Sequence, residues 1–241
     1  MLQDIHSDVQ WYNIDESIQA YIPTNYNTKP GGYNLDFTNT ETGNKTRKNI
    51  QVVGRDFRVQ YLKISTSIES STRTEEANEE YRKYFHPAVA SSSTSKYYTE
   101  AFILPTKGRL TTEFGETRTV NGAPTSYRHS GLDIAAPKGT EVLSTNRGKV
   151  VLAMPLILTG NTIVIDHGEG LFSVYLHMDK LFVTKDQMVD RGQLIGAVGS
   201  TGFSTGPHLH FTMSYYRTNV EPGYFIYGKS ITKQNYTQLM K

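Results

Sequence analysis

His208 and His210 carry the clearest chemical signal in this sequence of 241 residues. They follow Pro207, and the segment HLHFTMS that they open has the composition of a β-strand. Residues two apart in a strand point to the same face, about 7 Å apart at Cα, so both imidazoles would face one cleft. One imidazole could then bind a metal ion while the other reaches the reacting atom. The simpler alternative is a pair of neighbouring histidines on the exposed face of a strand.

A second pair, His129 and Asp133, lies in the segment HSGLD. The surrounding Ser, Gly, Ala and Pro residues disfavour a helix, and in an extended strand the two side chains would be about 13 Å apart. Their convergence therefore requires a bend, which the backbone of Gly131 permits. An imidazole and a carboxylate suit Zn²⁺ as ligands. This spacing is weak evidence alone and gains weight from the His-x-His pair.

His177 is the fifth candidate, at the end of the expected strand LFSVYLH, where the residues of a site often project from a rigid frame. A catalytic zinc site keeps three protein ligands and one open position for water, whereas four protein ligands close it. The five candidates therefore supply three ligands and two spare histidines for general-base and oxyanion-stabilising work. The remaining histidines are expected to be structural or solvated: His6, His86 and His167.

Composition narrows the classes of function. The chain has no cysteine, which excludes disulfide scaffolds, cysteine nucleophiles, cysteine-zinc sites and iron–sulfur clusters. Its formal net charge is +2 and its basic residues form no run, so nucleic acid is not an expected partner. The longest apolar stretch, residues 150–158, has about half the length of a membrane span. The N-terminus lacks the pattern of a secretory signal, so either the protein stays inside the cell or a leader or anchor lies outside this sequence.

The elements that must position the candidates lie in the second part of a mainly β chain. From residue 101, short apolar strands alternate with turns and no long helical period appears, which predicts a compact antiparallel β-sheet or barrel-like core over residues 101–241. Residues 1–100 are expected to form a smaller β-rich accessory domain. A capping-box spacing predicts one short helix at about 73–85, and the Ser/Thr-rich residues 88–99 are expected to form a linker.

The segments HSGLD, YLH and GPHLH, in this order, resemble the motifs of the lysostaphin/LytM-type zinc metallopeptidases. The resemblance covers roughly residues 102–226. It implies an antiparallel β core with a groove walled by loops, and hydrolysis of peptide bonds in bacterial peptidoglycan. It also implies zinc ligands, namely His129, Asp133 and His210, and catalytic histidines, namely His177 and His208. No motif position is lost, which argues for an active enzyme.

The same resemblance suggests where substrate would bind. Two loops are expected to wall the groove, residues 117–128 before His129 and residues 200–206 before His208. The candidate substrate contacts are Arg118, Asn121, Tyr127, Asn161 and Phe203. Each could instead be an ordinary loop residue, and a turn role is favoured for Asn161. The order of elements before residue 101 is similar to longer family members, whose accessory β-domain is sometimes immunoglobulin-like.

Two other functions compete with the enzyme. Some relatives lack the metal ligands and act as non-catalytic peptidoglycan-binding or hydrolase-activating modules. The hairpin sequences also have the character of a lipoyl or biotinyl carrier domain, although no lysine is framed like an attachment site. The bond cleaved stays open between a glycine–glycine cross-bridge, a stem-peptide cross-link between D-amino acids and a non-wall peptide. An enzyme of the cell wall would act outside the cytoplasm, with its export signal or anchor beyond this sequence.

Overall fold

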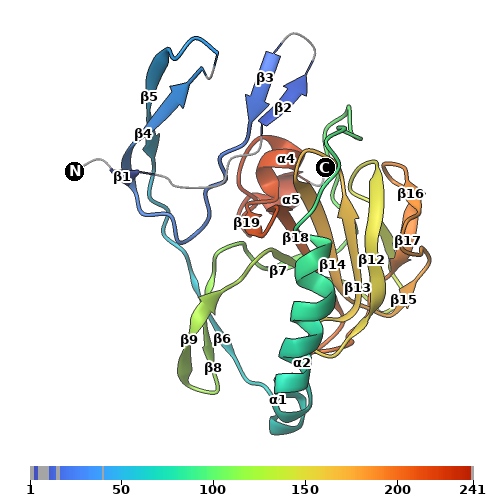
Figure 1. The fold of residues 1–241 in the computed structure, drawn as a ribbon. Helices are drawn as coiled ribbons and strands as arrows, with labels where there is room; N and C mark the ends of the chain where they lie inside the picture. The colour runs from blue at the N-terminus through green and yellow to red at the C-terminus, as the bar shows by residue number, and fades with distance from the viewer. Residues whose placement is uncertain (1–2, 5–10, 15–16, 40, 240–241) are drawn as a thin grey trace. The chain divides into compact units, whose positions relative to one another are not determined.

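The computed structural model describes most of the chain, namely residues 3–4, 11–14, 17–39 and 41–239. The chain contains two compact units, Met1–Phe57 and Arg58–Lys241. Both are built mostly from β-strands, which confirms the predicted fold class (Figure 1). The domain boundary predicted between residues 100 and 101 stays a prediction. Among the described residues, none of the helices combines the length and the apolar character needed to cross a membrane.

The first unit consists of two antiparallel hairpins and a short strand. Its strands are β1 (Gln3–Asp4), β2 (Trp11–Ile14), β3 (Ser17–Ala20), β4 (Gly31–Thr38) and β5 (Lys45–Val52). β4 and β5 pair over their full lengths, and β1 adds to β4 in parallel. Tyr33 of β4 is buried, and its hydroxyl donates a hydrogen bond to the carbonyl of Lys29 at 2.7 Å. Most of β5 is exposed, so this unit buries little apolar surface.

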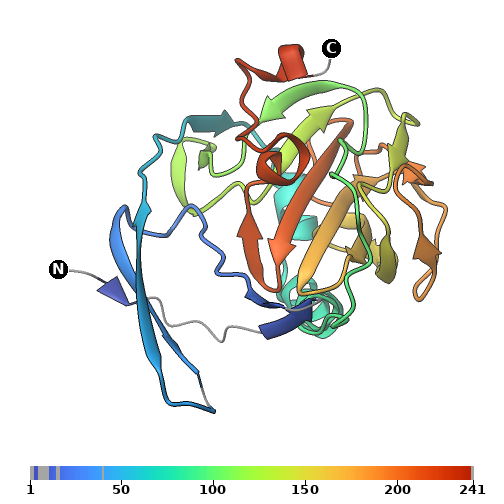
Figure 2. The ribbon, with the colours of Figure 1, turned by 90° about the horizontal axis from the view of Figure 1, so that it is seen from above.

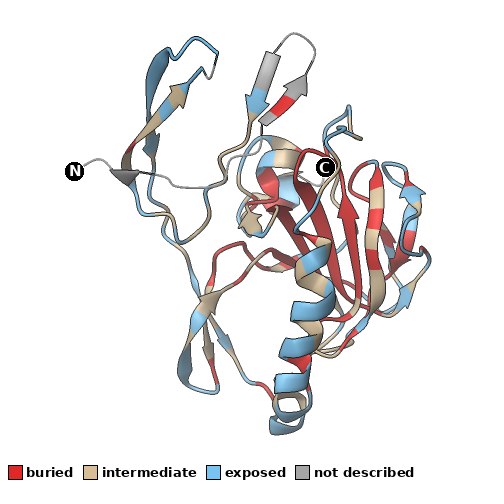
Figure 3. Cartoon of the chain, in the orientation of Figure 1, coloured by how far each residue is buried: buried red, intermediate tan, exposed pale blue. Residues whose placement is uncertain are grey.

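The second unit is organised around an eight-stranded antiparallel sheet. Along the sheet its strands are β16 (Met188–Val189), β12 (Gly148–Leu156), β13 (Gly160–Asp166), β14 (Leu171–Met178), β18 (His208–Tyr215), β10 (Leu132–Ala135) and β7 (Arg109–Thr112), with β19 (Thr218–Val220) on β18. Every residue of β14 is buried (Figure 3). Covering of both faces explains why LFSVYLHM shows no alternation of apolar and polar residues.

Two smaller sheets flank the central one. The first contains β11 (Glu141–Leu143), β17 (Leu194–Ala197) and β15 (Lys180–Leu181). The second contains β6 (Val59–Leu62), β8 (Thr117–Val120) and β9 (Ala123–Arg128). β6 runs parallel to β8, with Val59 opposite Thr117, so a strand from well before residue 101 joins the segment in front of His129. The sequence predicts residues 117–128 as a loop, whereas β8 and β9 pair there as an antiparallel hairpin.

A helical run precedes the core. It consists of α1 (Thr66–Thr72), α2 (Glu75–Glu80), a π-helical turn η1 (Tyr81–Phe85) and α3 (His86–Ala88). Ser65 caps α1 and Thr74 caps α2, so the run breaks at Arg73, which has a non-helical backbone conformation. The sequence predicts a helix only from about residue 73, so α1 is a helix that the sequence analysis does not predict. Two short helices follow the sheet, α4 (Gly223–Tyr227) and α5 (Tyr236–Leu239).

The end of the helical run packs against one face of the central sheet, as both ribbon views show (Figures 1 and 2). Phe85, Ala88 and Val89 contact a cluster of buried side chains from β12, β13 and β14. That cluster contains Leu152, Leu156, Val164, Phe172, Val174 and Leu176. Burial of side chains of this size contributes about 1.5–3 kcal/mol each, so the contact fixes the helical run on the sheet.

Residues 89–101, which include most of the predicted linker, have no helix or strand and yet pack along the core. The Ser92 hydroxyl donates a hydrogen bond to Asp166 Oδ1 at 2.6 Å, and the Ser93 amide donates to Asp166 Oδ2 at 2.9 Å. A Cβ on Gly168 would lie 2.0 Å from the carbonyl oxygen of Ser95, so glycine is required where the segment crosses. The serine-rich composition therefore serves to satisfy a buried carboxylate.

Candidate functional site

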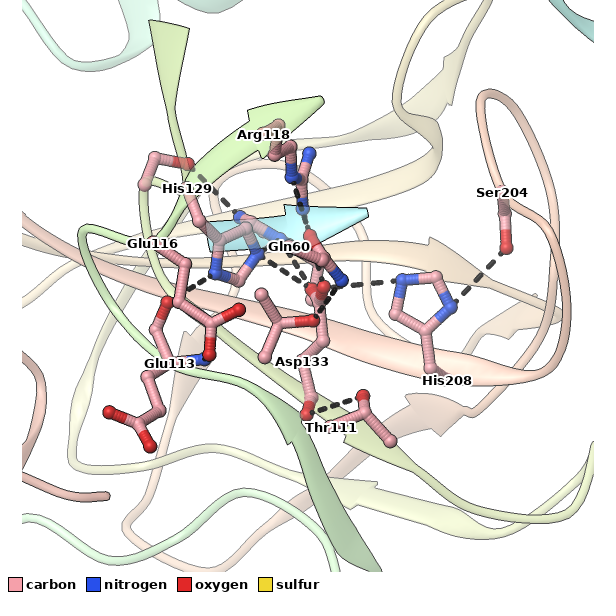
Figure 4. A network of polar contacts seen from close by, with 12 residues as sticks. Gln60, Thr111, Glu113, Glu116, Arg118, His129, Asp133, Ser204 and His208 are labelled. Atoms are coloured by element: carbon pink, nitrogen blue, oxygen red, sulfur yellow. Dashed lines mark hydrogen bonds and ion pairs between the residues drawn. The ribbon is translucent and has the colours of Figure 1, made fainter. Parts of the chain in front are cut away.

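The pairing of β10 with β18 brings the two sequence motifs together. Asp133 lies directly opposite His210 in this antiparallel register, and Ala135 lies opposite His208. His129 precedes β10 in the HSGLD segment and reaches the same place. Figure 4 shows Asp133 between the His129 and His208 rings. Strand pairing thus joins residues 77 positions apart in the chain.

Three ligand atoms converge at this point. His129 Nε2 lies 2.9 Å from Asp133 Oδ1, His210 Nδ1 lies 2.8 Å from the same oxygen, and the two nitrogens are 3.0 Å apart. All three residues are buried. Burial raises the pKa of Asp133, but the charges and hydrogen bonds of His129 and His210 outweigh it and hold this pKa well below its usual range. Burial lowers the pKa of His210 to about 4, so its ring is neutral at pH 7.

The outer nitrogen of His129 is fixed by a loop. His129 Nδ1 lies 2.9 Å from the carbonyl oxygen of Glu113. A carbonyl can only accept, so Nδ1 carries the hydrogen and Nε2 presents its lone pair to the cluster. The loop is held in turn from the C-terminal segment, because the Lys233 amide donates to Glu113 Oε1 at 2.8 Å and Lys233 Nζ contacts Glu116 Oε1 at 2.7 Å.

The outer nitrogen of His210 faces two hydroxyl groups. Its Nε2 lies 2.9 Å from Thr212 Oγ1 and 3.1 Å from Ser130 Oγ. If the His210 Nδ1 lone pair faces the cluster, Nε2 carries the hydrogen and donates to these hydroxyls. The His129, Asp133 and His210 atoms then form three acceptors that point at one another, and a cation between them would satisfy all three. Two neutral imidazoles and one carboxylate fit Zn²⁺.

His177 and His208 lie next to this group with the same tautomer. His177 Nδ1 is 2.8 Å from the carbonyl oxygen of Thr201, and His208 Nδ1 is 2.8 Å from that of Gly206. Both Nδ1 atoms therefore donate, and both Nε2 atoms are left as acceptors. The two ring centroids are 4.9 Å apart, and His208 Nε2 is 3.7 Å from Asp133 Oδ1. Burial lowers the pKa of His177 to about 3, with further lowering from the charges of His208 and His210.

The backbone of His177 is itself unusual. It has a φ of 63°, in the left-handed region that residues other than glycine rarely adopt. The pairing of β13 with β14 shifts register just there, between Asn161 and Ile163. Such irregularities re-aim a side chain at the end of a strand. Here the irregularity turns the imidazole toward His208 and His210.

The predicted substrate contacts fall into two groups. Arg118, Tyr127 and Phe203 line the same cleft as the histidines, which has a volume of about 750 Å³. Asn121 and Asn161 are engaged with backbone instead. The Asn121 amide bonds to both the N–H and the carbonyl of Ile64, each at 3.0 Å. The Asn161 amide donates to the carbonyls of Met178 and Asp179, also at 3.0 Å, which holds the end of β14.

Arg118 contacts a member of the cluster directly. Its Nη2 lies 3.4 Å from Asp133 Oδ2, and its Nε donates to Gln60 Oε1 at 2.9 Å. The Gln60 amide donates in turn to Thr112 Oγ1 at 2.8 Å. Oδ2 of Asp133 is thus occupied by a guanidinium while Oδ1 faces the histidines. A strand outside the resemblance, β6, therefore supports the site through Gln60.

Of the three histidines expected to be structural or solvated, two lie within the described residues. His167 is buried and bonds to the carbonyl of Arg147 and the hydroxyl of Ser173. Desolvation lowers its pKa to about 4. His86 is partly exposed beside Arg217. His6 lies outside the described residues.

Sequence reasoning missed several residues that hold the site. Thr212 had a usable signal, because it is two positions after His210 and shares its strand face. Ser130 is inside the HSGLD motif. Gln60, Arg73 and Lys233 had no such signal, because only the tertiary fold brings their segments to the cleft or the loop below it.

Comparison with known proteins agrees with this geometry. The sequence model of Peptidase family M23 matches residues 127–222, which contain all five candidate metal-binding and catalytic residues. A solved structure from Pseudomonas aeruginosa assigned to peptidase M23 is 27% identical and superposes with a TM-score of 0.65 over 90% of this chain and 83% of the other. Residues 127–222 therefore form a domain of Peptidase family M23, the lysostaphin/LytM-type family.

Two curated relatives differ in what their names state. The peptidoglycan DD-endopeptidase ShyB of Vibrio cholerae is 48% identical over 83 residues, 34% of this chain and 20% of that protein. The murein hydrolase activator NlpD of Salmonella dublin is 36% identical over 137 residues, 56% of this chain and 34% of that protein. The chain thus spans about a third or less of the length of these relatives. One is named as an enzyme and the other as an activator.

Proposed function

We propose that this protein is a zinc-dependent endopeptidase that hydrolyses peptide bonds of bacterial peptidoglycan, in a cross-bridge or a stem peptide. The observation that carries the proposal is the convergence of His129 Nε2, Asp133 Oδ1 and His210 Nδ1 beside two further histidines whose Nε2 atoms are acceptors. Three ligands leave a position open for water and substrate, as a catalytic zinc site requires.

The ligand roles follow from the hydrogen bonds. His129, Asp133 and His210 would hold Zn²⁺, with the Glu113 carbonyl and the Thr212 hydroxyl fixing the two rings from behind. A bound Zn²⁺ would lower the pKa of a water molecule and polarise the scissile carbonyl. Arg118 would keep Asp133 oriented, so we assign it a positioning role. Asn121 and Asn161 are assigned structural roles.

His177 and His208 are the proposed catalytic histidines. Because each donates from Nδ1 to a backbone carbonyl, each offers an Nε2 lone pair to a proton of the attacking water. We assign the general base to His208, which is the nearer to Asp133 Oδ1. The imidazolium formed on His208 can then give its proton to the departing amine nitrogen. His177 would orient the water through its own acceptor.

The activator named among the relatives is the second candidate function, because its matched region is the longer of the two. The retained ligand set favours the enzyme. Peptidoglycan lies outside the cytoplasmic membrane, so the proposed place of action is the cell wall or cell surface.

The test is turnover of purified peptidoglycan fragments by the full chain, with products identified by mass spectrometry. We expect zinc-loaded protein to release peptide products, a chelator to abolish them, and His208→Ala to reduce the rate by 100-fold or more, within the range of general-base contributions. A zinc-loaded protein that binds fragments without cleaving them would support the activator.

A further inference from the structure

Arg73 joins the two walls of the cleft. Its guanidinium carbon lies 4.3 Å from the centre of the Phe203 ring and 5.1 Å from that of the Tyr127 ring. Its Nη2 also donates a hydrogen bond to the Tyr127 hydroxyl. Arg73 comes from the break between α1 and α2, outside the matched residues 127–222. All three side chains line the cleft that contains the candidate metal ligands.

Within the part of the chain that the structure describes, no ion pair offsets the charge of Arg73. None of the ion pairs found among the described residues involves Arg73. The Phe203 and Tyr127 rings lie against the guanidinium, and the Tyr127 hydroxyl accepts a hydrogen bond from one of its N–H groups. The remaining in-plane N–H groups form the planar fork that matches a carboxylate. An arginine fixed in orientation without an anion is prepared for one that arrives with a ligand.

The charges of the residues that line the cleft also favour an anionic ligand at Arg73. Among the described lining residues, the formally charged ones are Arg73, Arg118 and Asp133. Arg118 and Asp133 offset each other through their 3.4 Å contact. A divalent metal ion would add positive charge. The excess positive charge among the described lining residues is therefore at Arg73, and a cleft of one sign attracts a ligand of the other.

We propose that Arg73 binds a free carboxylate of the substrate peptide and so makes the enzyme selective for anionic cross-links. This rests on the proposed function, because the same cleft must hold the scissile bond. A stem-peptide cross-link between D-amino acids carries free carboxylates close to the linkage, whereas the interior of a glycine bridge carries none. The inference thus selects the stem-peptide cross-link among the bonds that the sequence leaves open.

Two matched substrates test this assignment on the zinc-loaded full chain. One is a stem-peptide dimer with free carboxylates, and the other is the same dimer with those groups converted to carboxamides. The wild type should prefer the carboxylate dimer by about 10- to 100-fold in kcat/KM, mainly through KM, since a charge-assisted bond is lost with the amide. Arg73→Gln should bring this ratio close to one, and Arg73→Lys should restore part of it.

Arg82→Gln is the matched control. Arg82 lies on the same helical run, is largely exposed and pairs with Glu75, so its replacement should leave the preference intact. A preference that persists in Arg73→Gln overturns the assignment. An equal acceleration of both substrates by Arg73→Gln also overturns it, because Arg73 would then be a barrier across the cleft. Thermal unfolding of each variant verifies that it is folded.

Measurements of substrate binding, without turnover, test the role of Arg73 separately from the proposed endopeptidase activity. If the wild type cleaves neither dimer, calorimetric titration of both dimers into the wild type and Arg73→Gln still decides about Arg73. Tighter binding of the carboxylate dimer that is lost in Arg73→Gln supports the inference although the endopeptidase proposal has failed. Equal affinities of the wild type for the two dimers overturn the inference.

Discussion

Asp133 and His210 face each other across the β10–β18 pair, and a single oxygen of Asp133 is 2.8 Å from His210 Nδ1. The other oxygen contacts Arg118. One carboxylate oxygen of Asp133 therefore faces the cleft histidines, and the other contacts a guanidinium. This division orients Oδ1 toward the position where the three ligand atoms meet.

The hydroxyl behind His210 should control metal affinity. Thr212→Val keeps the side-chain volume and removes the nearer of the two hydroxyl groups that face His210 Nε2, while Ser130 Oγ stays in place. Loss of such a partner typically lowers metal affinity by about 10- to 100-fold. Competition with a chromophoric chelator measures this change. Ser214→Ala on the same strand is the control, because the Ser214 hydroxyl has no hydrogen-bond partner in the described structure and its removal should leave zinc affinity unchanged.

Gly131 should be intolerant of any side chain. A Cβ at this position would lie 2.1 Å from the carbonyl oxygen of Phe211 and 2.5 Å from Thr212 Oγ1. Gly131→Ala should therefore push β18 away from the HSGLD segment and lower the free energy of unfolding by about 2 kcal/mol or more. Gly206→Ala meets no atom within 4 Å and should change it by less than about 0.5 kcal/mol. Equal stabilities of the two variants in urea would contradict the close approach.

Lys233 should stabilise the loop beneath His129. Its ammonium contacts the buried Glu116 carboxylate, and Lys233→Met would leave that charge without its partner. Because the Lys233 side chain is 34% exposed, the expected loss is only about 1–2 kcal/mol in the free energy of unfolding. Lys149→Met removes an exposed pair with Asp186 and should cost less stability than Lys233→Met. Denaturant unfolding with zinc bound compares the two, and no difference between them would argue against the loop's dependence on Lys233.

His167 should make stability fall in acid. Its pKa is about 4 in the folded protein because of desolvation, against an ordinary value of 6.5. The unfolded chain therefore binds more protons between these values, and the free energy of unfolding decreases as pH falls from about 6.5 to 4, by at most about 3 kcal/mol from this group. His167→Asn should flatten the dependence over that interval. Titration of the His167 ring near pH 6.5 by NMR would show the prediction to be wrong.

The sequence alone predicts the β core and the five candidates, because the strand patterns and the motifs are local. HLHFT places three side chains on one face by strand geometry alone. The sequence predicts that the backbone of Gly131 permits a bend. The φ angle of Gly131 is not in the left-handed region, so this is not why glycine is needed. Glycine is needed there because β18 approaches closely. That requirement depends on strand pairing, which no local pattern contains.

The rest of the site depends on segments that meet only in the folded chain. Gln60 reaches Arg118 because β6 adds in parallel to β8, and Lys233 reaches Glu116 from the last turns of the chain. Arg73 lies between α1, which the sequence does not predict, and α2, which begins the predicted helix. These contacts join residues more than 50 positions apart, and residue spacing carries no information about them.

The central claim is that His129, Asp133 and His210 hold one zinc ion with a position left open. A crystal structure of the zinc-loaded protein, with the ion located by its anomalous scattering, tests it most directly. The account predicts one strong peak bonded to His129 Nε2, Asp133 Oδ1 and His210 Nδ1, with water in the remaining position and His208 unbound. A peak elsewhere, or an ion closed by a fourth protein side chain, would contradict it.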